Sequence, residues 1–203
     1  MIDLLNQFIA FMNNGGIIMW VLFVLNLLLW FGLGYRYMVL QRGTKGNVRR
    51  QIHKHLKRGE TQKIRGVLDE AIIDAINALK ESKKLGLKPR AHIIDALSFY
   101  LASFGQYSIL VKTIVVLAPL VGLLGTVMGM IETFDALQTG SMFSQGASIS
   151  GGISKALFTT ELGLVVAVPG LIVGRVLDKK EERLELEFEQ LTDILCTENL
   201  DEV

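Results

Sequence analysis

Three polar side chains inside long apolar stretches are the chain's strongest candidates for chemistry. Thr126 lies in the stretch 113–131, and Thr160 and Glu161 lie in the stretch 156–174. A hydroxyl both donates and accepts hydrogen bonds, so a pair of threonines suits a narrow wet path or a protonatable carboxyl on a partner protein. Thr126 lies five residues before the end of its stretch, and Thr160 lies four residues after the start of its own. If both stretches cross a membrane in opposite directions, we expect the two hydroxyls at nearly the same depth in it. The alternative is that they serve helix packing alone.

Glu161 is the one acid in its stretch. An ionised carboxylate is costly in hydrocarbon, so such residues face a protein interior or water, or are protonated. We therefore group Thr126, Thr160 and Glu161 as candidate residues of an ion pathway. The simpler interpretation of Glu161 is an acid near the outer membrane surface that pairs with Lys155.

Small residues repeat along the same two stretches. In the second stretch they recur at alternating steps of four and three, and the first contains a GxxxG motif. Such faces let helices approach closely in lipid, where no hydrophobic force drives helices together. The expected packing residues are Gly122, Gly125, Gly129, Ala156, Gly163 and Ala167.

Other chemistry is poorly supported by the sequence. One cysteine excludes an internal disulfide, and with three histidines it gives no zinc spacing. The motifs of P-loop nucleotide binding, serine hydrolases and zinc proteases are absent, and a net charge of +1 does not suggest a nucleic-acid binder. We therefore expect no enzymatic activity, no metal and no cofactor.

The elements that position the candidate residues are predicted to be membrane-spanning helices. The chain has 203 residues, is 50% hydrophobic and has a mean hydropathy of +0.40, which is too apolar for an ordinary soluble domain. A bilayer core of about 30 Å needs roughly 20 apolar residues. Three runs meet that length, and we predict spans at 16–40, 112–132 and 155–175. Residues 1–15 are predicted to form a short amphipathic helix on the membrane surface, or else a frayed tail.

The positive charges predict the orientation of the spans. From Arg36 to Lys112 lie 16 of the 21 Lys and Arg residues, and none lies between Glu132 and Ser154. The positive-inside rule therefore places residues 41–111 in the cytoplasm and the 133–154 loop in the periplasm. The N-terminus is then outside, and the tail 176–203 is cytoplasmic.

Helical periodicity continues outside the predicted spans. Apolar residues repeat from Ile64 to Leu79, and that helix is expected to end near Gly86. A second pattern begins at Pro89, and we expect one long helix from there to Gln138. The third span is expected to continue as a helix to about Cys196, because apolar residues recur at heptad-like spacing among acidic ones: Leu177, Leu184, Phe188, Leu191 and Leu195. The predicted fold is an all-α membrane protein whose second and third spans extend into the cytoplasm.

The sequence resembles a known family in two segments. VLAPLVGLLGTVMGMIETF, residues 116–134, and GGISKALFTTELGLVVAVPGLIVG, residues 151–174, are similar to the two hallmark segments of the MotA/TolQ/ExbB proton channel family. Three spans with a large cytoplasmic segment after the first resemble the ExbB and TolQ branch, whereas the flagellar MotA branch has four spans.

The resemblance implies a subunit of a proton-driven stator in the bacterial inner membrane. It implies a homopentamer around a pore that holds single-span helices of an ExbD- or TolR-like partner with a membrane-embedded Asp, which acts on a TonB- or TolA-like energy transducer. The family's pore threonines align with Thr126 and Thr160.

One departure from the family keeps a second interpretation open. ExbB and TolQ commonly carry a Glu near the outer start of the third span, where this chain has Lys155, and an apolar residue where this chain has Glu161. The sequence leaves open whether Glu161 takes over that role. The alternative function is a structural membrane scaffold that conducts no ions.

Overall fold

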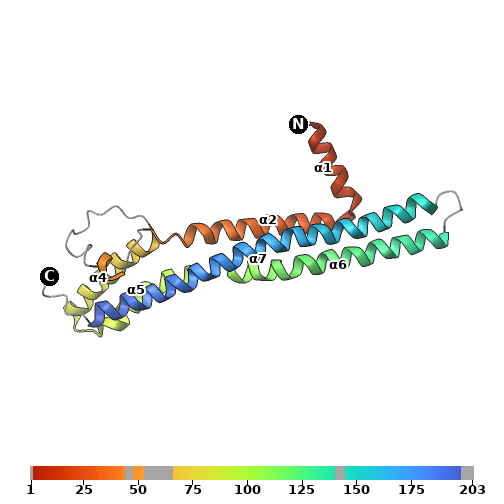
Figure 1. The fold of residues 1–203 in the computed structure, drawn as a ribbon. Helices are drawn as coiled ribbons and strands as arrows, with labels where there is room; N and C mark the ends of the chain where they lie inside the picture. The colour runs from red at the N-terminus through yellow and green to blue at the C-terminus, as the bar shows by residue number, and fades with distance from the viewer. Residues whose placement is uncertain (1, 44–47, 53–65, 140–144, 198–203) are drawn as a thin grey trace. The chain divides into compact units, whose positions relative to one another are not determined.

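The computed structural model describes residues 2–43, 48–52, 66–139 and 145–197, which are mostly helical. Figure 1 shows the helices α1 (Ile2–Asn14), α2 (Gly16–Val39), α4 (Val67–Leu85), α5 (Pro89–Phe104), α6 (Ser108–Thr139) and α7 (Gln145–Thr197). Residues 48–52 form a further short helical stretch. The described residues contain no β-strand, so the predicted all-α class is confirmed.

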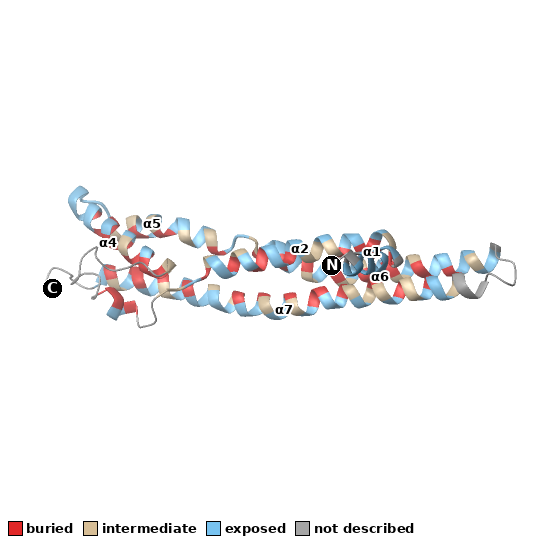
Figure 2. Ribbon diagram, turned by 90° about the horizontal axis from the view of Figure 1, so that it is seen from above, coloured by how far each residue is buried: buried red, intermediate tan, exposed pale blue. Residues whose placement is uncertain are grey.

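Three stretches of helix are long and apolar enough to cross a membrane, and they lie on α2, α6 and α7. The predicted number of helices that are apolar enough to span a membrane is therefore confirmed. Their outer faces are apolar and open: Figure 2 shows exposed residues along all three helices, and Leu120, Leu123 and Leu124 of α6 are each more than half exposed. These faces are available to lipid or to other helices.

The chain divides into two compact units. The first contains residues 1–33 and 109–174. Within it, α7 contacts both α2 and α6, because a Cβ added at Gly170 would lie 2.7 Å from a methyl of Leu29 and 3.0 Å from a methyl of Val115. The helix predicted at the N-terminus forms as α1, and its Phe11 ring packs edge-on against Phe158 of α7 with ring centroids 5.3 Å apart.

The second unit contains residues 34–108 and 175–203. Gly86 ends α4 with a φ of 66°, a left-handed cap that glycine adopts without steric cost. Pro89 occupies the first turn of α5, as predicted. The described core side chains include Leu68, Ile72, Ile76, Ile93, Leu97, Phe104, Leu177, Leu184, Phe188, Leu191 and Leu195.

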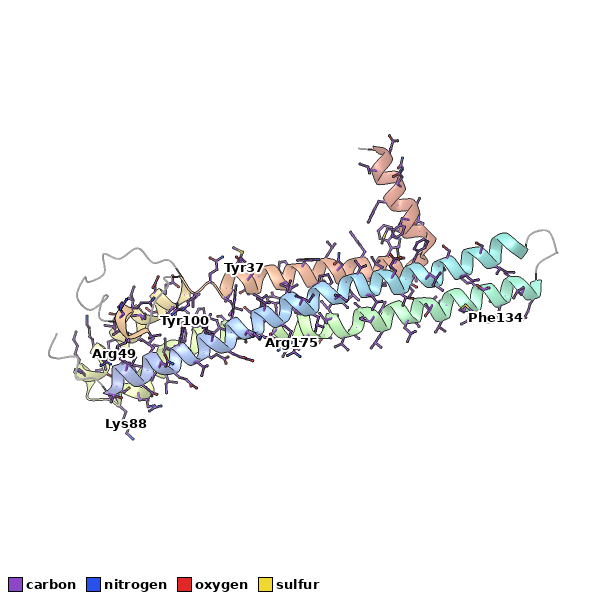
Figure 3. All side chains as sticks on the ribbon, viewed as in Figure 1. Tyr37, Arg49, Lys88, Tyr100, Phe134 and Arg175 are labelled. Atoms are coloured by element: carbon purple, nitrogen blue, oxygen red, sulfur yellow. The ribbon has the colours of Figure 1, made fainter. Side chains whose placement is uncertain are left out.

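A tyrosine hydroxyl joins α4 to α5 in this unit. Tyr100, labelled in Figure 3, donates a hydrogen bond of 2.6 Å to Oδ2 of Asp74. Burial, together with this bond to a carboxylate, raises the pKa of the Tyr100 hydroxyl well above its usual value. The phenol therefore stays protonated and remains a donor.

The expected single helix from Pro89 to Gln138 is wrong. Residues 105–107 form a turn between α5 and α6, and Tyr107 adopts a φ of 62°. Such a φ costs a residue with a side chain about 1–2 kcal/mol. Tyr35 stabilises the turn, because its hydroxyl donates to Oε1 of Gln106 at 2.8 Å and its ring packs against Tyr107 at 4.9 Å. Pro119, in contrast, lies inside α6 without ending it.

The third helix continues as predicted. α7 runs from Gln145 to Thr197 and contains Pro169. Its apolar residues from Leu177 to Leu195, predicted from heptad-like spacing, form the buried side of the helix in the second unit. The tail is therefore a packed helix rather than a solvated one.

A buried arginine connects the end of α2 to α7. Arg36 is 1% exposed, and its Nη2 lies 2.9 Å from Asp178 and 2.5 Å from Glu181. Within the described part of the chain, its Nε and Nη1 are buried without a hydrogen-bond partner. One cation thus holds two carboxylates of α7 at the cost of two unsatisfied donor nitrogens.

Candidate functional site on the α6 and α7 pair

Glycines bring the backbones of α6 and α7 into contact. A Cβ added at Gly122 would lie 2.9 Å from the carbonyl oxygen of Thr159, and one added at Gly163 would lie 2.8 Å from the carbonyl oxygen of Ala118. At Gly129 a Cβ would lie 2.7 Å from the carbonyl oxygen of Gly152. These distances leave no room for a side chain, so the two helices pack backbone to backbone.

Thr159 and Thr133 complete this contact, although neither is among the packing residues predicted from the sequence. Thr159 is fully buried, and a Cβ added at Gly125 would collide with its side chain. Its hydroxyl donates to the carbonyl oxygen of Ala156 at 2.9 Å, and the Thr133 hydroxyl donates to that of Gly129 at 2.9 Å. The spacing of Thr159 from Gly152 and Gly163, at steps of seven and four, is the signal that could have identified it.

The register of the pair places Thr126 and Thr160 about half a turn apart along the axis. A Cβ at Gly122 would contact Thr159, Thr160 and Gly163, and a Cβ at Gly125 would meet the side chain of Thr159. Because the helices are antiparallel, Thr126 is therefore level with about residue 158. Its offset from Thr160 is about two residues, or about 3 Å along the axis. The expectation that both hydroxyls lie at nearly the same depth in a bilayer stays a prediction.

Thr126 and Thr160 also share one side of the pair. The residues in contact form a stripe along each helix, the contact stripe: Gly122, Gly125 and Gly129 on α6, and Ala156, Thr159 and Gly163 on α7. At about 100° per residue, Thr126 and Thr160 are each rotated about 70° from the contact stripe of their helix, in the same sense along the chain. Because the helices are antiparallel, the same rotation brings both residues to the same side. Both are half-buried, and their hydroxyls donate to carbonyl oxygens of their own helices, Leu123 at 2.5 Å and Ala156 at 2.9 Å.

An ion pair occupies the opposite side. Nζ of Lys155 lies 2.5 Å from Oε1 of Glu132, so Lys155 pairs with α6. Its side chain also covers Gly16 at the start of α2, where a Cβ would lie 2.8 Å from Cε of Lys155. The first span therefore packs on the Lys155 side, and the side with the two threonines is turned away from it.

Glu161 lies on a third face. It is exposed, and it is rotated about 170° from the contact stripe, so it points away from α6. The structure thus brings Thr126 and Thr160 to one surface and does not bring Glu161 to it. The suggested pairing of Glu161 with Lys155 is not present, because Lys155 binds Glu132.

Comparisons of the whole sequence with protein families and with known proteins point to the same family. A profile of the MotA/TolQ/ExbB proton channel family matches residues 41–190. The chain is 42% identical over 72 residues to biopolymer transport protein ExbB-like 3 of Synechocystis, an alignment that covers 35% of this chain and 34% of that protein. It is 49% identical over 70 residues to ExbB-like 1 of the same organism, covering 34% of this chain and 28% of that protein.

A longer match is to biopolymer transport protein ExbB of Pseudomonas putida, at 28% identity over 160 residues. That alignment covers 73% of this chain and 47% of the relative. The chain therefore spans less than two thirds of each of these three relatives.

Proposed function

The chain belongs to the MotA/TolQ/ExbB proton channel family, and we propose that it is the ExbB/TolQ-like subunit of a proton-driven stator in the bacterial inner membrane. It assembles as a homopentamer with an ExbD/TolR-like single-span partner. The complex converts proton motive force into mechanical work on a TonB- or TolA-like transducer. The family is one of channels rather than enzymes, so the chemistry required is proton transfer alone.

The observation that supports this proposal is the surface that Thr126 and Thr160 share. It is formed by α6 and α7, is turned away from the first span and carries hydroxyls in an otherwise apolar environment. A partner helix placed there meets two groups able to bind a carboxyl, about half a turn apart along the axis. The glycine contact behind them aligns α6 with α7, and this alignment sets the separation of the two hydroxyls along the helix axis.

The role of Thr160 is tested by removing its hydroxyl. In liposomes with both subunits, Thr160→Ala should lower proton uptake roughly fivefold, because one hydrogen bond to the partner carboxyl is worth about 1 kcal/mol. Thr160→Ser keeps the hydroxyl and should stay near the wild-type rate. Thr113→Ala, at an exposed threonine on α6, is the matched control. Wild-type flux in Thr160→Ala, Thr126→Ala and the double variant, each assembled normally, would exclude the pathway.

Glu161→Gln separates charge from packing at the neighbouring position. Because Glu161 points away from the surface that Thr126 and Thr160 share, we expect the Glu161→Gln complex to assemble and to retain part of the proton uptake. Complete loss of uptake in an intact complex would instead place Glu161 in the ion path.

The proposed orientation is tested by labelling from outside intact cells. In a Cys196→Ser background, a cysteine at exposed Ser150 should react with an impermeant thiol reagent, and one at exposed Lys84 should react only after the membrane is opened. The reason is the concentration of positive charge in residues 41–111. The cysteine-free chain controls for background, and equal labelling of both positions from outside contradicts the orientation.

A non-conducting scaffold remains the second candidate, and the ion pair of Lys155 with Glu132 favours it. This pair stands where ExbB and TolQ commonly carry an acid, and it neutralises the charge of Glu132. The proton-uptake assay separates the two functions, because a scaffold supports assembly without any flux dependent on the proton gradient.

A further inference from the structure

A groove between α5 and α7 in the second unit has an apolar floor that is open to solvent. Its volume is about 600 Å³, within the range of about 300–1,000 Å³ that is typical of small-molecule sites. Leu97 and Phe188 are buried at its floor, whereas Ile94 and Leu101 of α5 line it and are exposed. Apolar surface is therefore available in the groove to the methylene groups of a ligand.

The rim of the groove on α7 is acidic. It carries Glu185, Glu189 and Asp193, at steps of four residues. Residues four apart on a helix lie on one side of it, about 6 Å apart along the axis. Asp193 is paired, because its Oδ1 lies 3.2 Å from Nη2 of Arg90. Glu185 and Glu189 have no cationic partner in the described part of the chain.

The electrostatic surroundings of Glu185 are those of an uncompensated charge. Partial burial is the main cause that raises its pKa, and the carboxylates of Glu181, Glu182 and Glu189 raise it further. No cation of the described chain acts in the opposite sense on Glu185. Two positive charges placed against Glu185 and Glu189 would therefore stabilise both carboxylates in their ionised form.

This missing charge specifies the chemistry of a ligand. It must carry two cations about 6 Å apart, one for each free carboxylate. Two ammonium groups linked by four methylenes are separated by five single bonds of about 1.5 Å, which span about 6 Å when extended. Each ammonium group supplies three hydrogen-bond donors, and the methylenes can lie on the apolar floor. A linear polyamine has this pattern of charged and apolar groups.

The size of the groove favours a small ligand over a second protein. Nine described residues line it, whereas a stable protein interface uses about 20 residues or more on each side. The acidic rim from Glu185 to Asp193 extends over about 12 Å of helix. That length suits a short linear amine.

We propose that the groove between α5 and α7 binds a linear polyamine, with one ammonium group at Glu185 and a second at Glu189. The groove lies in the second unit, whereas Thr126 and Thr160 lie in the first, so this site is independent of the proposed function. A ligand that binds only the folded state stabilises it. The polyamine should therefore also raise the thermal stability of the second unit.

Equilibrium dialysis of radiolabelled spermidine against the full chain in detergent tests the site. Spermidine contains two ammonium groups separated by four methylenes, and we expect it to bind saturably. Glu185→Gln combined with Glu189→Gln should weaken its affinity about fivefold or more, because two ion pairs are lost. Asp95→Asn is the matched control, at an exposed acid about 160° around α5 from Leu97, and should leave the affinity within about twofold.

Competition separates this ligand from general attraction of cations. Putrescine, which has two ammonium groups on four methylenes, should displace spermidine. n-Butylamine, with the same chain and one ammonium group, and Mg²⁺, with two charges and no chain, should each require at least tenfold higher concentrations. Spermidine should also raise the midpoint of thermal unfolding of the wild type and leave that of the Glu185→Gln, Glu189→Gln variant unchanged.

Three results would overturn the proposal. The first is an unchanged affinity for spermidine in the variant that lacks both carboxylates. The second is displacement by n-butylamine or Mg²⁺ at the same concentration as putrescine, which would mean that the groove attracts cations without recognising their spacing. The third is binding of spermidine only after copurifying proteins are removed, which would mean that a protein segment fills the groove.

Discussion

Gly163→Leu should prevent α6 and α7 from packing and should abolish the assembled complex. A Cβ at Gly163 would lie 2.8 Å from the carbonyl oxygen of Ala118 and 3.3 Å from Cα of Gly122, both of them backbone atoms. A backbone cannot move aside as a flexible side chain can, so the helices must separate. Overpacking of this kind costs about 3 kcal/mol. Native mass spectrometry in mild detergent should show the complex largely dissociated.

A glycine on the same helix provides the matched control. Gly151 has no atom near the position that a Cβ would take, so Gly151→Leu should assemble as the wild type does. Val24→Leu, at an exposed site of the first span, controls for added volume elsewhere. If Gly163→Leu assembles as well as Gly151→Leu, the backbone contact between α6 and α7 is not what holds the pair.

Arg36→Leu should lower the thermal stability of the second unit by roughly 10 °C. The substitution leaves Asp178 and Glu181 close together without their cation, in positions that are 22% and 16% exposed. Losing one partner of a buried ion pair costs about 3 kcal/mol or more. The midpoint of thermal unfolding of the purified complex measures the effect.

The size of the loss should depend on the carboxylates left behind. Adding Asp178→Asn and Glu181→Gln to Arg36→Leu removes both charges and should recover more than half of the lost stability. Arg183→Leu, at an exposed arginine of α7, should change the midpoint by less than about 2 °C. A similar loss in Arg183→Leu and Arg36→Leu would show that burial of the cation is not the cause.

Local patterns predicted the helices because each depends on nearby residues. The heptad-like spacing of the tail identified the buried side of α7, and Gly86 and Pro89 marked the junction of α4 and α5. The break at Tyr107 could not be predicted in this way. A positive φ at a tyrosine is unfavourable by itself, and its stabilising contacts come from Tyr35, which is distant in the sequence.

The candidate site was predicted only in part for a similar reason. Small-residue spacing identified which faces of α6 and α7 could meet, but it could not fix their register to within one turn. The register decides that Thr159 is buried, that Thr126 and Thr160 are offset, and that Lys155 meets Glu132. Each of these outcomes depends on two helices at once.

The hydrogen bonds of Thr126 and Thr160 decide whether this surface binds a carboxylic acid or its carboxylate. Each hydroxyl donates its hydrogen bond to a carbonyl oxygen of its own helix, so it presents oxygen lone pairs outward. A lone pair accepts from the O–H of a neutral carboxylic acid and repels a carboxylate. Binding the anion would require the hydroxyl to turn and to give up a helix bond worth about 1 kcal/mol. This surface therefore raises the proton affinity of any carboxyl that reaches it, so that the acid is held while it carries a proton and is released once it has lost it.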